Sequence, residues 1–185
     1  MYPLVRLGIE LALARAAPPL PLDGVHVTRL TCWPWDIDPW RELNNGRTLT
    51  LYDLGRVPLA WRTGLVGVLR ANGWGLTVAG SSVRYRRRVR AFDRLELRSA
   101  FVGRDARFLY VEQAMYRASE ASSEATSSGL FRSAVTGPGG IVPTDRVVAA
   151  LGDPPLPRLP AWVAAWSAAE AERPWPPEFP EGRAA

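Results

Sequence analysis

Residues 35–46 read Trp-Asp-Ile-Asp-Pro-Trp-Arg-Glu-Leu-Asn-Asn-Gly, and an apolar run over residues 48–69 follows them at once. Carboxylates and paired amides directly before a long apolar segment are typical of a loop that feeds the N-terminus of a buried helix. The free N–H groups and the dipole of such a helix end favour an anion or a polarised carbonyl oxygen, so a nearby carboxylate could attack an acyl carbon or activate water against it. The spacing alone favours ordinary cap and turn residues over a catalytic site.

The helix expected over residues 49–69 has apolar positions over too wide an arc for a surface helix, so we expect it to be buried on most sides. Pro58 should end or kink it, because proline removes an intrahelical donor. Gly64 or Gly67 can allow a second bend, and Asn72-Gly73 closes the helix.

The apolar period then changes to two, which predicts strands. We expect strands at residues 76–89, 94–102, 107–116 and 130–136, with a loop at 119–128 and an earlier strand at 25–35. One strand, one long buried helix and four antiparallel strands is the order expected of a sheet that curls around a central helix.

The first residues, 2–17, form a helix-length apolar segment that Arg6, Glu10 and Arg15 interrupt. The segment is too short and too interrupted to span a bilayer and does not have the layout of a signal peptide. We therefore expect a cytoplasmic protein whose first helix packs on the domain surface, with shallow membrane association as the alternative.

A Pro-rich connector at residues 17–22 separates this helix from the rest, and length favours one domain plus tails. The predicted organisation is an N-terminal helix and connector at 1–22, the main domain at 23–143, and a helical, Pro/Trp-rich tail at 144–185. In the tail we expect a short helix at 145–151, capped by Thr144 or Asp145, and a second at 161–172.

The charge balance is basic, with a formal charge of +5 and a pI near 10.1. The sequence contains no lysine, so all 23 basic residues are arginines. Because arginine titrates so high, the pI overstates a modest net charge. The excess is compatible with an anionic ligand but does not require one.

Cys32 and His26 are the only residues of their kinds. A disulfide within the chain is therefore impossible, and one Cys with one His cannot make a usual zinc site. Cys32 lies in a β-like run and is expected to be a small buried side chain. His26 stands without a nucleophile motif, so a Ser-His-Asp or Cys-His system is not indicated.

The motif Asp-Ile-Asp-x-x-x-Glu-Leu-Asn-Asn-Gly at residues 36–46 resembles the Asp-x-Asp-x-x-x-His-x-Asn-Asn signature of hotdog-fold acyl-CoA thioesterases of the 4-hydroxybenzoyl-CoA thioesterase-like group. The similarity extends more loosely over residues 25–136. It implies an α+β hotdog fold, an antiparallel sheet wrapped around a long central helix. This chain has Glu42 in place of the histidine, Thr48 in place of an aromatic residue, and Arg88 in place of a proline.

The resemblance implies that Asp38 is the nucleophile or general base, with backbone N–H groups near residues 45–47 holding the thioester oxygen. Glu42 can be a second acid or base, although an ionised glutamate cannot donate a hydrogen bond as an imidazole does. The arginine run over residues 84–90 can bind the coenzyme A phosphates or be a solvated strand edge. The expected catalytic residues are Asp38, Glu42 and Asn45, and the expected substrate-binding residues are Asp36, Asn44, Gly46, Arg86, Arg87 and Arg88.

The function expected from this resemblance is hydrolysis of an acyl-CoA to the free acid and coenzyme A, without metal or redox cofactor. By the same resemblance the protein should be a homodimer or tetramer. Three alternatives stay open: an acyl-thioester binding protein of the same fold, a basic nucleic-acid-binding module, and a dehydratase or isomerase. Nucleic acid is disfavoured because exposed aromatics do not alternate with the arginines of residues 84–90.

Overall fold

The computed structural model describes residues 2–118 and 124–177. Its helices are α1 (Leu4–Ala16), α2 (Asn45–Arg62), α3 (Leu65–Ala71), α4 (Thr144–Ala150) and α5 (Ala161–Glu172). Its strands are β1 (Val25–Thr31), β2 (Gly75–Tyr85), β3 (Arg94–Arg104), β4 (Leu109–Arg117), β5 (Ser127–Gly137) and β6 (Gly140–Ile141), and a 3-10 turn, η1 (Pro34–Asp36), follows β1.

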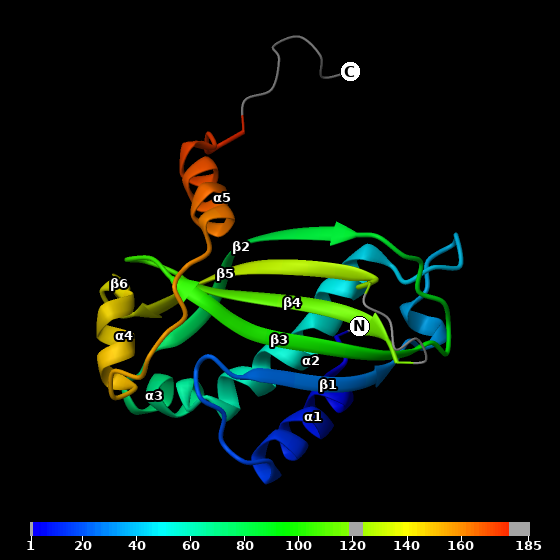
Figure 1. Ribbon diagram of the computed structural model, residues 1–185, viewed down its shortest axis with the longest axis horizontal. Coiled ribbons are helices and arrows are strands. Elements are labelled where there is room, and N and C mark those ends of the chain that lie inside the picture. The colour runs from blue at the N-terminus through cyan, green and yellow to red at the C-terminus, as the bar shows by residue number, and fades with distance from the viewer. Residues whose placement is uncertain (1, 119–123, 178–185) are drawn as a thin grey trace.

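The strands form one antiparallel sheet in the order β1-β3-β4-β5-β2, with β6 paired to β5. This sheet curls around α2, while α1 packs against α2 from outside (Figure 1). The α+β hotdog arrangement predicted from the sequence is therefore confirmed. Residues 119–123 of the loop expected at 119–128 lie outside the described residues, and Ser127 and Ser128 belong to β5.

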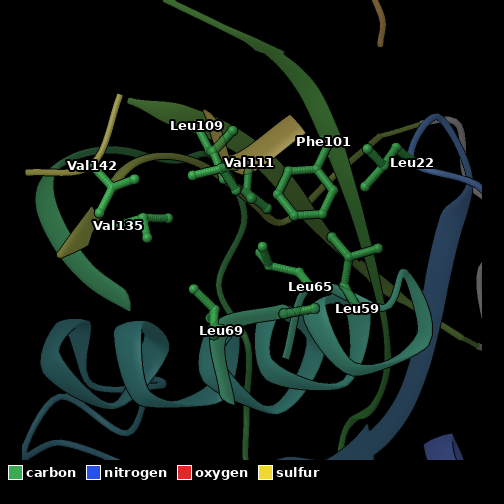
Figure 2. Close-up of a cluster of buried hydrophobic side chains, with 11 residues drawn as sticks. Leu22, Leu59, Leu65, Leu69, Phe101, Leu109, Val111, Val135 and Val142 are labelled. Atoms are coloured by element: carbon green, nitrogen blue, oxygen red, sulfur yellow. The ribbon is translucent and has the colours of Figure 1, made fainter. Parts of the chain in front are cut away.

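The core lies between the sheet and the helices α2 and α3. Figure 2 shows side chains of the sheet pointing toward Leu59, Leu65 and Leu69 on the helices. Burial of such apolar side chains is the main favourable contribution to folding. The same cluster includes Leu22 of the connector and Val147 of α4, so both chain ends contribute to the core of the domain.

The first strand is shorter than expected. β1 ends at Thr31, opposite Arg94 of β3, instead of continuing to residue 35. Pro34 has no N–H for a sheet and starts η1, and the side chain of Asp36 accepts a hydrogen bond from the Trp33 N–H at 3.1 Å.

The central helix begins earlier than expected and is broken in one place. It starts at Asn45 because the Asn44 side chain accepts a hydrogen bond from the Arg47 N–H at 3.1 Å. The break between α2 and α3 falls at Gly64, whose φ of 80° is accessible to glycine at little cost, whereas Gly67 lies inside α3. Of the two glycines proposed for a bend, only Gly64 makes one.

Pro58 does not end the helix, which was one of the two outcomes expected for it. It lies inside α2 and cannot donate to the carbonyl oxygen of Leu54, four residues earlier. The Thr28 hydroxyl of β1 donates to that oxygen at 3.2 Å. The strand therefore supplies the hydrogen bond that proline removes, and the helix continues.

Thr28→Val is expected to destabilise the protein by about 1–3 kcal/mol, because the Leu54 oxygen would lose its donor in the interior. Urea unfolding measures the change. Thr77→Val is the matched control, since Thr77 is exposed on β2 and should change stability little. Equal effects of the two substitutions would contradict this role of Thr28.

The two helices expected after the sheet are present as α4 and α5. The predicted side-chain cap of α4 is wrong: Pro143 occupies the cap position, and the Thr144 hydroxyl donates instead to the backbone oxygen of Asp105. α5 packs through Val163 on Tyr110 and Leu130 of the sheet.

Candidate active site

A tight turn carries most of the motif residues. Ile37 and Leu43 form an isolated antiparallel bridge, and the Asp38 N–H donates to the Glu42 oxygen at 2.8 Å. The Asp38 carboxylate oxygen Oδ1 accepts hydrogen bonds from the N–H groups of Trp40 at 2.9 Å and Glu42 at 3.2 Å. Asp38 therefore closes the turn that positions Glu42.

Asp36 anchors this turn to the rest of the molecule. Its side chain is 0% exposed and forms ion pairs with Arg6 at 2.8 Å and Arg47 at 2.6 Å. Burial alone would raise the pKa of Asp36, but hydrogen bonds from Arg47, the Trp33 N–H and Arg6 outweigh it and hold this pKa below its ordinary value. Because Asp36 contacts Arg6 of α1 and Arg47 of α2, it ties the segment between β1 and α2 to both helices.

The first N–H groups of α2 point out of the helix beside this turn. The Arg47 N–H already donates to the Asn44 side chain, so it is not available to a ligand. The N–H groups of Asn45 and Gly46 have no acceptor among the described residues. Of the three N–H groups expected to bind a thioester oxygen, these two have no protein acceptor among the described residues.

A cavity of about 210 Å³ lies at this helix end. It is lined by the turn and the start of α2 on one side and by the end of β2, the loop after it and the start of β5 on the other. The lining residues predicted from the sequence are Glu42, Asn45, Arg86, Arg87 and Arg88, and the others include Thr48, Tyr85, Thr126 and Ser127. The structure thus brings the acidic turn and the basic run together.

Glu42 and Arg88 form an ion pair across the cavity, with Oε1 and Nε 3.3 Å apart. They are two of the three residues at which the sequence departs from the resembled pattern, the third being Thr48, and they contact each other. Both also line a neighbouring cavity of about 630 Å³, together with Trp40, Arg41 and Arg90. The pair therefore stands between two adjoining cavities.

Asp38, Asp36, Asn44 and Gly46 do not line either cavity. Asn44 caps α2, and a side chain at position 46 would approach the Asn44 amide oxygen to 3.2 Å, so glycine keeps this cap uncrowded. The sequence analysis missed Tyr85, whose hydroxyl donates to the Asn45 oxygen at 3.4 Å, and also Thr126 and Ser127. Residues 126–127 carry no signal beyond the Ser/Thr content that predicted a loop.

Backbone contacts fix the basic run relative to β5. The N–H groups of Arg86 and Arg87 both donate to the Thr126 oxygen, at 2.8 and 3.0 Å. Arg87 pairs with Glu124, and Arg88 pairs with Glu42. All three arginines are exposed at the surface.

His26 and Cys32 lie away from the cavity. Burial and the nearby Arg62 lower the pKa of His26 to about 4, so its ring is neutral near neutral pH. Arg62 donates to its Nδ1 at 3.1 Å, so Nε2 carries the proton and faces the Thr28 hydroxyl at 3.1 Å. Burial, with Asp36 and Asp93, raises the pKa of the Cys32 thiol to about 12, which leaves it unreactive.

Within residues 2–118 and 124–177, no three His, Cys, Asp or Glu side chains gather in a way that could hold a metal ion. Across the same described ranges, no helix has the length and apolar character required to cross a bilayer.

The fold and this site define a protein class, and comparison with known families agrees. The family model of the thioesterase-like superfamily matches residues 32–167, so the chain belongs to that superfamily. Protein THEM6 of Xenopus laevis is 34% identical over 80 residues, which cover 43% of this chain and 39% of that protein. The chain thus matches less than half of the length of this relative.

Solved structures share the hotdog fold at low sequence identity. The probable thioesterase YbaW of Escherichia coli has a TM-score of 0.63 and 14% identity, covering 69% of this chain and 97% of that chain. The DHNA-CoA thioesterase of Staphylococcus aureus has a TM-score of 0.58 and 13% identity, covering 80% of this chain and 91% of that chain. Smu.793 of Streptococcus mutans, solved bound to acetyl CoA, has a TM-score of 0.51 and 15% identity, covering 64% and 86%.

Proposed function

We propose that the cavity at the start of α2 binds an acyl-CoA and that a carboxylate of the turn hydrolyses its thioester. The observation that carries this proposal is the cavity itself, in which Glu42, Arg88 and the N-terminus of α2 meet. The N–H groups of Asn45 and Gly46 would hold the thioester oxygen as negative charge develops on it. One structural relative is named as a DHNA-CoA thioesterase and another was solved bound to acetyl CoA, which favours the same ligand class here.

The geometry favours Glu42 as the general base. Its carboxylate lines the cavity, whereas Oδ1 of Asp38 is occupied by two backbone N–H groups. In this mechanism Arg88 turns to a coenzyme A phosphate and releases Glu42, which takes a proton from the water that attacks the acyl carbon. The carbon–sulfur bond then breaks, and coenzyme A leaves as the thiolate.

Asp38 is the second candidate, because the resemblance assigns the chemistry to it. Its other carboxylate oxygen, Oδ2, accepts no hydrogen bond from the described residues. That oxygen could attack the acyl carbon directly if substrate reaches the turn, and Glu42 would then act with it as a second acid or base.

Coenzyme A release from short, long and aromatic acyl-CoA substrates tests the proposal. Glu42→Gln should lower kcat by about 100-fold or more, because it removes the base but keeps the shape. Asp38→Asn keeps the Oδ1 acceptor and so should retain activity within about threefold. Arg88→Gln should raise KM for acyl-CoA but not for an acyl-pantetheine, which lacks the nucleotide.

The opposite pattern, with Asp38→Asn inactive and Glu42→Gln active, would assign the chemistry to Asp38. Tight binding of acyl-CoA without turnover by the native protein would indicate an acyl-thioester binding protein.

We also propose self-association through β2, an edge strand whose exposed Leu76 and Val78 could pair with a second copy.

A further inference from the structure

Five apolar side chains at the start of α1 and in the loops after β1 and β2 are exposed. The two loops lie at the same end of the sheet (Figure 1). We call these five side chains the tip surface, and its residues are Leu4, Val5, Trp33, Trp35 and Phe92. Trp33 stacks on Trp35 with ring centroids 5.3 Å apart, and Phe92 meets Trp33 edge-on at 6.2 Å. Leu4 and Val5 share with the two tryptophans a groove of about 770 Å³.

The outer face of α1 continues the tip surface. Val5, Ile9 and Leu13 are exposed at intervals of one helical turn, and the exposed residues between them on this face are small and uncharged. Arg6 instead turns inward to Asp36, and Glu10 is half-buried. A surface helix normally presents its charges outward, so α1 has the reverse arrangement on this face.

Arginines border these apolar residues. Arg41 and Arg90 are exposed and line the 630 Å³ cavity together with Trp40, which is 77% exposed. The carboxylate in that cavity lining, Glu42, already pairs with Arg88, so the border is positively charged. A second copy seated here would bring a like-charged border with it, whereas an anionic lipid surface would offer the opposite charge.

We propose that the tip surface and the outer face of α1 bind the surface of an anionic phospholipid membrane. Tryptophans beside aliphatic side chains and arginines are the composition of segments that lie in the headgroup region. In this orientation the two cavities that Glu42 and Arg88 line would border the membrane. The inference does not depend on which reaction that cavity carries out.

Co-sedimentation of the full chain with phosphatidylcholine vesicles, with and without phosphatidylglycerol, tests this proposal. The native chain should bind the anionic vesicles more strongly. The double variant Val5→Gln/Trp35→Gln should bind at least about tenfold more weakly, because two apolar groups no longer enter the lipid. Arg90→Gln should weaken only the phosphatidylglycerol-dependent part, by about fivefold.

Trp162→Gln/Ile141→Gln is the matched control, since both residues are exposed apolar side chains away from the tip surface, and it should bind like the native chain. No binding to anionic vesicles, or equal loss in both double variants, would overturn the proposal. Conversion of a dimer to a monomer by Val5→Gln/Trp35→Gln, without vesicle binding by the native chain, would instead assign the surface to a second copy. Binding of a single-stranded oligonucleotide that Val5→Gln/Trp35→Gln abolishes, without vesicle binding by the native chain, would overturn it in favour of nucleic acid.

Discussion

Asp36→Asn is expected to lower the free energy of unfolding by about 3 kcal/mol, because it leaves two arginines beside a neutral amide in a poorly solvated site. The native carboxylate accepts four hydrogen bonds, from Arg6, from two nitrogens of Arg47 and from the Trp33 N–H. Asparagine keeps the shape but turns an N–H₂ donor toward one of these donors. The arginines are about four-fifths buried and can partly reach water, which sets the effect at the lower end for a broken buried pair.

Urea unfolding at neutral pH measures this loss. Asp145→Asn is the matched control: its carboxylate pairs with Arg104 but is 79% exposed, so the change should be about 1 kcal/mol or less. The native pKa of Asp36 is depressed, so its stabilisation is complete above the unfolded pKa of 3.8 and is lost as pH falls through the native value. The difference in unfolding free energy between the native protein and Asp36→Asn should therefore narrow only at acidic pH. At neutral pH, a loss of stability as small as that of Asp145→Asn would contradict the anchoring role of Asp36.

The same ion pairs explain why the fold was easier to predict than the site. The long buried helix and the alternating strands follow from apolar periodicity, which is local in sequence. The Asn44 cap and the Asp38 turn are also local. The contacts of Asp36 with Arg6 and of Glu42 with Arg88 join segments that only the folded sheet brings together.

The contact between Thr28 and the central helix could not be predicted for the same reason. Pro58 was expected to end or kink the helix; the helix does not end there, and Thr28 of β1 supplies the donor that proline lacks. Local patterns cannot report partners that tertiary packing selects.

The stability of the native protein is expected to fall by about 3 kcal/mol between pH 7 and pH 4 through His26 alone. Burial first, and then Arg62, lower the pKa of this imidazole from 6.5 in the unfolded chain to about 4. Between these values the unfolded state binds a proton that the native state does not accept. Stability is therefore complete above about pH 6.5 and declines as pH falls toward 4.

His26→Gln isolates this effect, because glutamine can accept from Arg62 and donate to Thr28 but does not titrate. Burial raises the pKa values of Glu10 and Glu112, so both bind protons at a higher pH in the native state than in the unfolded chain. Their protonation therefore adds stability as pH falls, opposite to the effect of His26. These groups are the same in both proteins, so the difference between native and variant reports His26. In urea unfolding from pH 8 down to pH 5, the stability of His26→Gln relative to the native protein should increase as pH falls. Since His26 is the only histidine, its ring resonances give an independent titration. A midpoint near 6.5 in the folded protein would contradict the buried neutral ring.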